Sequence, residues 1–170
     1  MKTKKTVKML TRAAAVAALY TALTFVSAFM GLSSGVIQFR LSETLCLLPL
    51  IMPEAVWGLF IGCAVSNLLT GCVIWDVVFG SIATLIGALV TSRMTSFVSK
   101  NSWVASLPCV LSNALIVPLV LIFAYGAEGS FIFFFITVAV GELVMATLVG
   151  SFVYARLVKN SSLRRLLENN

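Results

Sequence analysis

Long apolar runs separated by short polar segments make up most of this chain. The runs predict six helices, at about 10–30, 42–52, 53–70, 76–98, 103–125 and 130–158. Four of these are long enough to cross a bilayer alone. The other two, 42–52 and 53–70, form either one long helix or two shorter ones interrupted around Pro49 and Pro53. The pattern therefore predicts a membrane protein with five or six crossings.

The composition excludes a soluble protein. Of 170 residues, 60% are hydrophobic and 11% are charged, and the mean hydropathy is +1.07, whereas soluble domains are about half apolar and a quarter charged. No polar linker or clear internal repeat divides the sequence, so we expect residues 1–170 to form a single membrane domain of the all-α class. The first apolar run, 13–30, exceeds the signal-peptide core of about 7 to 15 residues and is interpreted as a span.

Basic residues decide between five and six crossings. With six crossings and a cytoplasmic N-terminus, eleven of the 12 basic residues lie inside and only Arg40 lies outside, whereas five crossings place seven outside. The positive-inside rule therefore selects six crossings of the cell membrane, with both termini cytoplasmic. The inside set is Lys2, Lys4, Lys5, Lys8, Arg12, Arg93, Lys100, Arg156, Lys159, Arg164 and Arg165. We interpret these clusters as topology signals and expect no nucleic-acid partner.

The segment around residue 42 is unusual in two respects. A helix of about eleven residues rises only about 16 Å, so 42–52 either borrows residues from the preceding loop or meets 53–70 below the membrane surface. The preceding loop, 31–41, lies on the outer face in this topology. Its alternating Val36, Gln38 and Arg40 are expected to run extended as a lid strand.

An ionisable residue inside an apolar helix is a candidate functional residue, because charge in a bilayer is costly. Glu142 lies twelve residues into the last predicted helix, about 18 Å from its outer end, and Asn113 lies at a similar depth in the preceding helix. We expect the two to share a substrate-binding pocket. Alternatively, Glu142 is protonated, or bonded to Asn113 or a serine, and only holds helices together.

A second polar group is predicted at the outer membrane boundary. It comprises Gln38, Arg40, Glu43, Asn67 and Asp76, all candidates for binding a substrate. Two have structural alternatives, because Asp76 suits the N-cap of the helix that it opens and Glu43 suits a helix dipole. The aromatic residues Trp75, Phe39, Trp57 and Tyr125 are candidates for stacking on a planar ligand, and Trp75 is retained in the binding set. Aromatic residues at this depth also form interfacial belts.

The first predicted helix carries small residues every four positions. Ala14, Ala18 and Ala22 form a flat stripe on which another helix can pack closely in lipid. The packing partner is either a separate protein or another helix of this chain.

Several kinds of catalysis are excluded. The chain has no histidine, and Cys46, Cys63, Cys72 and Cys109 lack the spacing of a zinc site, so we expect no metal, no cofactor and no catalytic residues. It contains no phosphate-binding G-x-x-x-x-G-K-[ST] loop, no G-x-S-x-G elbow and no H-E-x-x-H helix. A non-enzymatic protein is therefore expected.

These features resemble a known family. Six helices with both ends inside, an alanine stripe on the first and an outer loop are similar to the substrate-binding S component of energy-coupling factor (ECF) transporters. The stretches 36–43 (VIQFRLSE) and 76–85 (DVVFGSIATL), together with Asn113, Gly141 and Glu142, resemble the QueT family, assigned to uptake of queuosine precursors.

The resemblance implies a substrate and partners. An S component captures a solute outside the cell, while a separate transmembrane coupling subunit and two ATPase subunits supply the energy. In that family the alanine stripe faces the coupling subunit. The implied ligand is a 7-deazaguanine such as preQ1 or queuine. Its guanine-like edge offers adjacent N–H donors to a carboxylate, and an aminomethyl ammonium favours a second acid; Glu142 and either Glu43 or Asp76 suit these roles.

Three alternatives remain at this stage. One is an S component for another vitamin-like solute. Another is a membrane structural or assembly protein without a ligand, in which Glu142 and the alanine stripe serve packing alone. The third is an ion-coupled transporter working without partners, which six helices lacking an inverted repeat disfavour.

Overall fold

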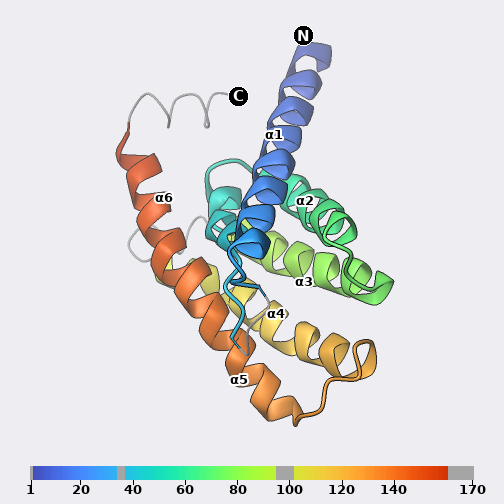
Figure 1. Cartoon of the computed structure of the whole chain (residues 1–170). Coiled ribbons are helices and arrows are strands. Elements are labelled where there is room, and N and C mark those ends of the chain that lie inside the picture. The colour runs from blue at the N-terminus through green and yellow to red at the C-terminus, as the bar shows by residue number, and fades with distance from the viewer. Residues whose placement is uncertain (1, 34–36, 95–101, 161–170) are drawn as a thin grey trace.

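The computed structural model describes residues 2–33, 37–94 and 102–160, and these residues form helices with no strand (Figure 1). The α-helices are α1 (Lys2–Phe29), α2 (Ala55–Leu69), α3 (Ile74–Arg93), α4 (Ser102–Phe123), α5 (Phe131–Glu142) and α6 (Gly150–Lys159). Two 3-10 helices, η1 (Leu41–Leu45) and η2 (Leu48–Leu50), and a π-helix, η3 (Leu143–Val149), complete the described elements.

The prediction of an all-helical membrane protein is confirmed for the described residues. Four helices there are long and apolar enough to cross a membrane: Lys5–Phe29, Ile74–Arg93, Ser102–Phe123 and Phe131–Lys159. The predicted helix at 76–98 begins earlier and ends at Arg93. Residues 95–98, and with them Val36, Lys100, Arg164 and Arg165, lie outside the described residues.

The predicted helix at 42–52 is wrong. The segment instead forms η1 and η2, because its backbone closes i→i+3 bonds such as Cys46 N to Glu43 O at 3.1 Å and Ile51 N to Leu48 O at 2.9 Å. Residues 42–50 are all buried. The segment lies between α1 and the α5–α6 helix (Figure 1). Irregular backbone is tolerated at membrane depth where protein surrounds it, as here.

One face of α1 holds η1 in place. Three polar side chains spaced four and three residues apart reach it: Tyr20 donates to Glu43 Oε1, Thr24 donates to Ser42 Oγ at 3.0 Å, and Ser27 Oγ accepts from Leu41 N at 2.8 Å. This spacing places the three on one side of a helix. The C-terminal half of α1 therefore positions η1 through hydrogen bonds.

A glycine pair brings α2 against α1. A Cβ at Gly58 would lie 2.6 Å from Ala13 O, and one at Gly62 would lie 2.9 Å from Ala17 O. Small residues spaced by four permit this close approach. From there the helices pack in chain order, α2 on α3, α3 on α4 and α4 on α5.

The last long helix contains a π-helical turn. α5, η3 and α6 follow one another without a break, and the π-turn begins immediately after Glu142. Glycines flank this turn: a Cβ at Gly141 would overlap the carbonyl of Gln38 in the loop before η1, and one at Gly150 would lie 3.2 Å from Thr44 O within η1. The C-terminal end of α6 and the N-terminal end of α1 both lie toward the top of Figure 1.

Candidate functional site

Polar residues near the C-terminal ends of α1, α2 and α4 line two adjoining compartments. The inner compartment is small, about 20 Å³, and is lined by Gln38, Arg40, Glu43, Gly80, Asn113, Val117, Val138 and Glu142. The outer compartment measures about 330 Å³. Because both are lined by Gln38, Arg40 and Val117, they form two parts of one cavity.

Glu142 and Asn113 meet in the inner compartment. The amide of Asn113 donates to Glu142 Oε1 at 3.1 Å, whereas Glu142 Oε2 is buried without any hydrogen-bond partner. The Glu142 residue is only 8% exposed. A buried carboxylate oxygen without a donor is costly, so this atom is the clearest place for a ligand to contribute one.

The outer compartment extends from the inner one to the ends of α1, α2 and α4. Its polar lining comes mainly from Asn67 and Thr70 at the end of α2, Asp76 in the first turn of α3, and Tyr125 after α4. Asn67 and Asp76 are almost fully buried, and the Asn67 amide donates to Asp76 O at 3.3 Å. Gly80 leaves room beside them, because a Cβ there would lie 3.1 Å from Asp76 Oδ1.

The N-cap interpretation of Asp76 is wrong. Helix α3 begins at Ile74 with Val73 as its N-cap residue, and no side chain caps it. The Asp76 carboxylate instead accepts a 3.0 Å hydrogen bond from Tyr125. Partial burial and the nearby Asp76 carboxylate raise the pKa of Tyr125, so its hydroxyl keeps its proton at neutral pH and can donate it. Glu43 lies in the first turn of η1 as expected, and its carboxylate accepts from Tyr20.

The loop before η1 supplies two polar side chains to the cavity. Gln38 and Arg40 both line the two compartments, as their spacing by two predicts for an extended backbone. Arg40 is extended, with φ −100° and ψ 109°, and no strand is assigned to the described part of this loop, 37–40. Val36 lies outside the described residues.

Acidic groups outnumber basic ones around the cavity. Among its lining residues, Arg40 is the only base, against the three acids Glu43, Asp76 and Glu142. Arg40 makes no ion pair within 4.0 Å among the described residues, and it lines the outer compartment together with Asp76. Within these residues, no three His, Cys, Asp or Glu side chains form a metal-binding group. The cavity therefore suits a ligand with hydrogen-bonding edges and positive charge.

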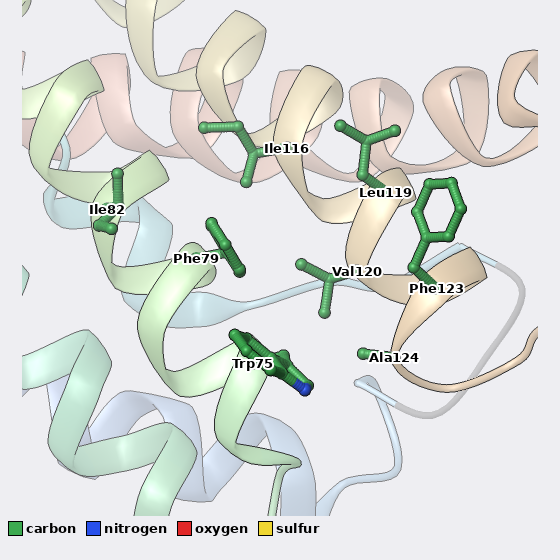
Figure 2. A pocket seen from close by; sticks show the side chains of 8 residues that line it. All are labelled: Trp75, Phe79, Ile82, Ile116, Leu119, Val120, Phe123 and Ala124. Carbon is green, nitrogen blue, oxygen red and sulfur yellow. The ribbon is translucent and has the colours of Figure 1, made fainter.

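Trp75 lies outside this cavity. It is 57% exposed and lines an apolar groove of about 580 Å³ between α3 and α4, together with side chains such as Phe79 and Leu119 (Figure 2). Apart from the indole nitrogen of Trp75, the lining residues offer no polar side chain, so the groove cannot read the edge of a base. Tyr125 is the only aromatic residue lining either part of the polar cavity.

The alanine stripe is accessible. Ala14, Ala18 and Ala22 are all exposed, and they lie on a face of α1 away from Tyr20 and from the side chains that hold η1. In the described structure α2 packs on another part of the helix, around Ala13 and Ala17. The stripe is therefore available to a separate partner.

Sequence reasoning missed two residues of α1 that hold η1, Tyr20 through Glu43 and Thr24 through Ser42. Tyr20 and Thr24 are buried on α1, and Thr24 lines the outer compartment. The available signal was their spacing by four, which places two hydroxyl groups on one face of an otherwise apolar helix.

The chain is similar to known transporters. The family model described as QueT transporter matches residues 10–159. A curated relative, the queuosine precursor transporter QueT of Lactococcus lactis subsp. cremoris (strain MG1363), is 30% identical over 175 residues, covering 97% of this chain and 100% of that protein. No solved structure matches the chain significantly.

Proposed function

This chain belongs to the QueT transporter family, and we propose from this premise that it is the substrate-capture subunit of an ECF importer. Its substrate in this proposal is a queuosine precursor, a 7-deazaguanine, bound on the outer side of the cell membrane. The proposal extends to this chain the substrate named for its relative from Lactococcus lactis.

The single observation that carries the proposal is the unpartnered Oε2 of Glu142 in a polar cavity. A membrane protein that only packs its helices together gains nothing from a buried carboxylate oxygen without a donor, whereas a substrate with N–H groups supplies one. The adjoining compartment of about 330 Å³ falls at the lower end of the range for small-molecule sites, about 300–1,000 Å³.

The position of the cavity fits capture from outside. We propose six crossings with both termini in the cytoplasm, the second crossing being the buried η1–η2 segment. The cavity then lies in the outer half, because the end of α1, the end of α2, the start of α3 and the end of α4 all contribute to it. With a cytoplasmic N-terminus, these four helix ends face outward.

Energy would come from separate subunits. The sequence contains no phosphate-binding loop, and the exposed stripe of Ala14, Ala18 and Ala22 offers a flat surface to another transmembrane helix. We propose a transmembrane coupling subunit on this stripe and two ATPase subunits in the same complex.

Uptake in a reconstituted system tests this proposal. A labelled 7-deazaguanine would be supplied to cells that express the chain alone, the coupling and ATPase subunits alone, or all of them. We expect accumulation only when all are present. Accumulation by the chain alone would contradict the proposal and indicate an ion-coupled transporter, and no accumulation by any combination would contradict the substrate.

A further inference from the structure

The two compartments of the cavity differ sharply in size. The inner one, about 20 Å³, exceeds only slightly the 10–15 Å³ or so that a single water needs by the same kind of measure, so it fits one small polar group such as an ammonium. The outer one, about 330 Å³, has room for a two-ring base. A ligand that fills both therefore has a broad part and a narrow tip.

The inner compartment is suited to a positive tip. Glu43 and Glu142 both line this compartment of about 20 Å³, so two carboxyl groups border the same small space. Each carboxyl group accepts one hydrogen bond from the protein, Glu43 from Tyr20 and Glu142 Oε1 from Asn113. The second oxygen of Glu142, Oε2, accepts none. Arg40 lines this compartment as well, so its two carboxyl groups face one guanidinium and the acids remain in excess. A primary ammonium carries three donors and a full charge, which matches that excess better than a neutral N–H edge does.

The outer compartment offers a mixed edge. Asp76 accepts hydrogen bonds, while Asn67, Gln38 and Arg40 carry N–H donors. A guanine-type edge is mixed in the same way, with N–H donors beside a carbonyl acceptor. The N–H donors of such an edge pair with a carboxylate of the protein, and its carbonyl pairs with a guanidinium or an amide.

We infer that the ligand binds with its base in the outer compartment, against Asp76 and Asn67, and with a short primary ammonium between Glu43 and Glu142. This inference rests on the proposed function and narrows its substrate class. The preferred ligand is a 7-deazaguanine with an aminomethyl group at position 7. A neutral nitrile at that position lacks the charge, and a ring on the amine, as in queuine, exceeds the inner space.

Calorimetry with the purified chain in detergent tests the orientation, using the 7-aminomethyl and 7-cyano compounds and queuine. We expect the aminomethyl compound to bind at least about tenfold more tightly than either of the others. Glu142→Gln should lower the affinity for the aminomethyl compound about thirtyfold or more and the affinity for the cyano compound less than about threefold. Asp76→Asn should lower the affinity for both compounds by a similar factor, because in this orientation Asp76 contacts the base that the two compounds share.

Specific outcomes would overturn the inference. If Glu142→Gln weakens the cyano and aminomethyl compounds equally, or if queuine binds as tightly as the aminomethyl compound, the orientation is wrong while the proposed function stands. Should Glu142→Gln fail to fold, Glu43→Gln provides the same comparison from the other side of the compartment. If no deazaguanine binds the parent chain, both the orientation and the proposed function fail.

Discussion

At the scale of single residues, Glu43, Asp76 and Glu142 are buried along a cavity where Arg40 is the only base. Such groups destabilise a membrane protein unless each finds a donor. Three such donors are present: Tyr20 donates a hydrogen bond to Glu43, Tyr125 donates one to Asp76, and Asn113 donates one to a single oxygen of Glu142. Among the described carboxylates, Glu142 Oε2 is the one fully buried oxygen without a hydrogen-bond partner, and that arrangement leaves one position for a ligand.

Tyr20→Phe tests the support of Glu43. The change removes one hydroxyl and leaves Glu43 Oε1 buried without its donor, so we expect the free energy of unfolding to fall by about 1–3 kcal/mol. Thermal unfolding of the purified protein in detergent measures this as a lower melting temperature.

Tyr125→Phe is the matched control. Tyr125 is 44% exposed, so water can replace its hydroxyl at Asp76, and the free energy of unfolding should change by no more than about 0.5 kcal/mol. If the Tyr20 variant is as stable as the Tyr125 variant, Glu43 does not depend on the tyrosine.

Much of the polar cavity could be predicted from the sequence. Glu142 and Asn113 stand out because polar residues are rare in apolar helices, whereas Gln38 and Arg40 stand out as alternating polar residues of the loop 31–41. The structure brings the four together. Trp75 does not join them: an aromatic residue at a helix end suits lipid as well as a ligand, and the sequence does not show which way it faces.

At the scale of elements, the long helices could be predicted and the short segment at 42–52 could not. An unbroken apolar run does not distinguish an α-helix from 3-10 turns, and here enclosure between α1 and the α5–α6 helix decides the outcome. The π-turn after Glu142 likewise leaves no mark in the apolar pattern. Such turns are frequent at functional sites, and this one begins beside the unpartnered carboxylate.

Gly141→Ala tests how the segment 37–40 is positioned. A methyl group at this position overlaps the carbonyl of Gln38, so it displaces the loop that carries Gln38 and Arg40 into the cavity. Overpacking of this kind costs about 1–3 kcal/mol, and we expect ligand affinity to fall roughly five- to hundredfold in calorimetry.

Gly58→Ala is its control, because that methyl group overlaps α1 away from the cavity. It should lower the melting temperature while the folded protein keeps its affinity. Equal affinity in the Gly141 variant and the parent would contradict the positioning of the loop.

Ala18→Phe tests the alanine stripe on α1. A bulky side chain on this exposed face separates the partner helix without reaching the cavity, so we expect uptake to be lost and ligand binding to be kept. Ala18→Ser, which stays small, should retain both. Loss of binding together with uptake in the Ala18→Phe variant would show that the stripe packs within this chain instead.

At the scale of the whole molecule, charge and architecture point the same way. The start of α1 and the end of α6 lie toward one side of the molecule, as an even number of crossings requires (Figure 1). Basic residues such as Lys5, Lys8 and Lys159 lie at these two ends. A cytoplasmic location for both would satisfy the positive-inside rule.

Labelling from outside intact cells tests this topology. In a background without the native cysteines, single replacements Lys5→Cys and Lys159→Cys should resist a membrane-impermeant maleimide, because six crossings place both inside. Glu128→Cys, in the exposed loop between α4 and α5, should react and serves as the positive control. Reaction at Lys159→Cys would contradict six crossings and place the last helix in the opposite direction.

The most direct measurement for the whole account is calorimetric titration of the purified chain, without any partner subunit, with 7-aminomethyl-7-deazaguanine. The cavity is formed by this chain alone, so we predict saturable binding with one site per chain. Guanine derivatives that lack the aminomethyl group at position 7 should bind more weakly. A chain that is folded, as shown by a cooperative melting transition, yet releases no binding heat with this compound at any concentration and is not stabilised by it would contradict the proposal that it captures a queuosine precursor.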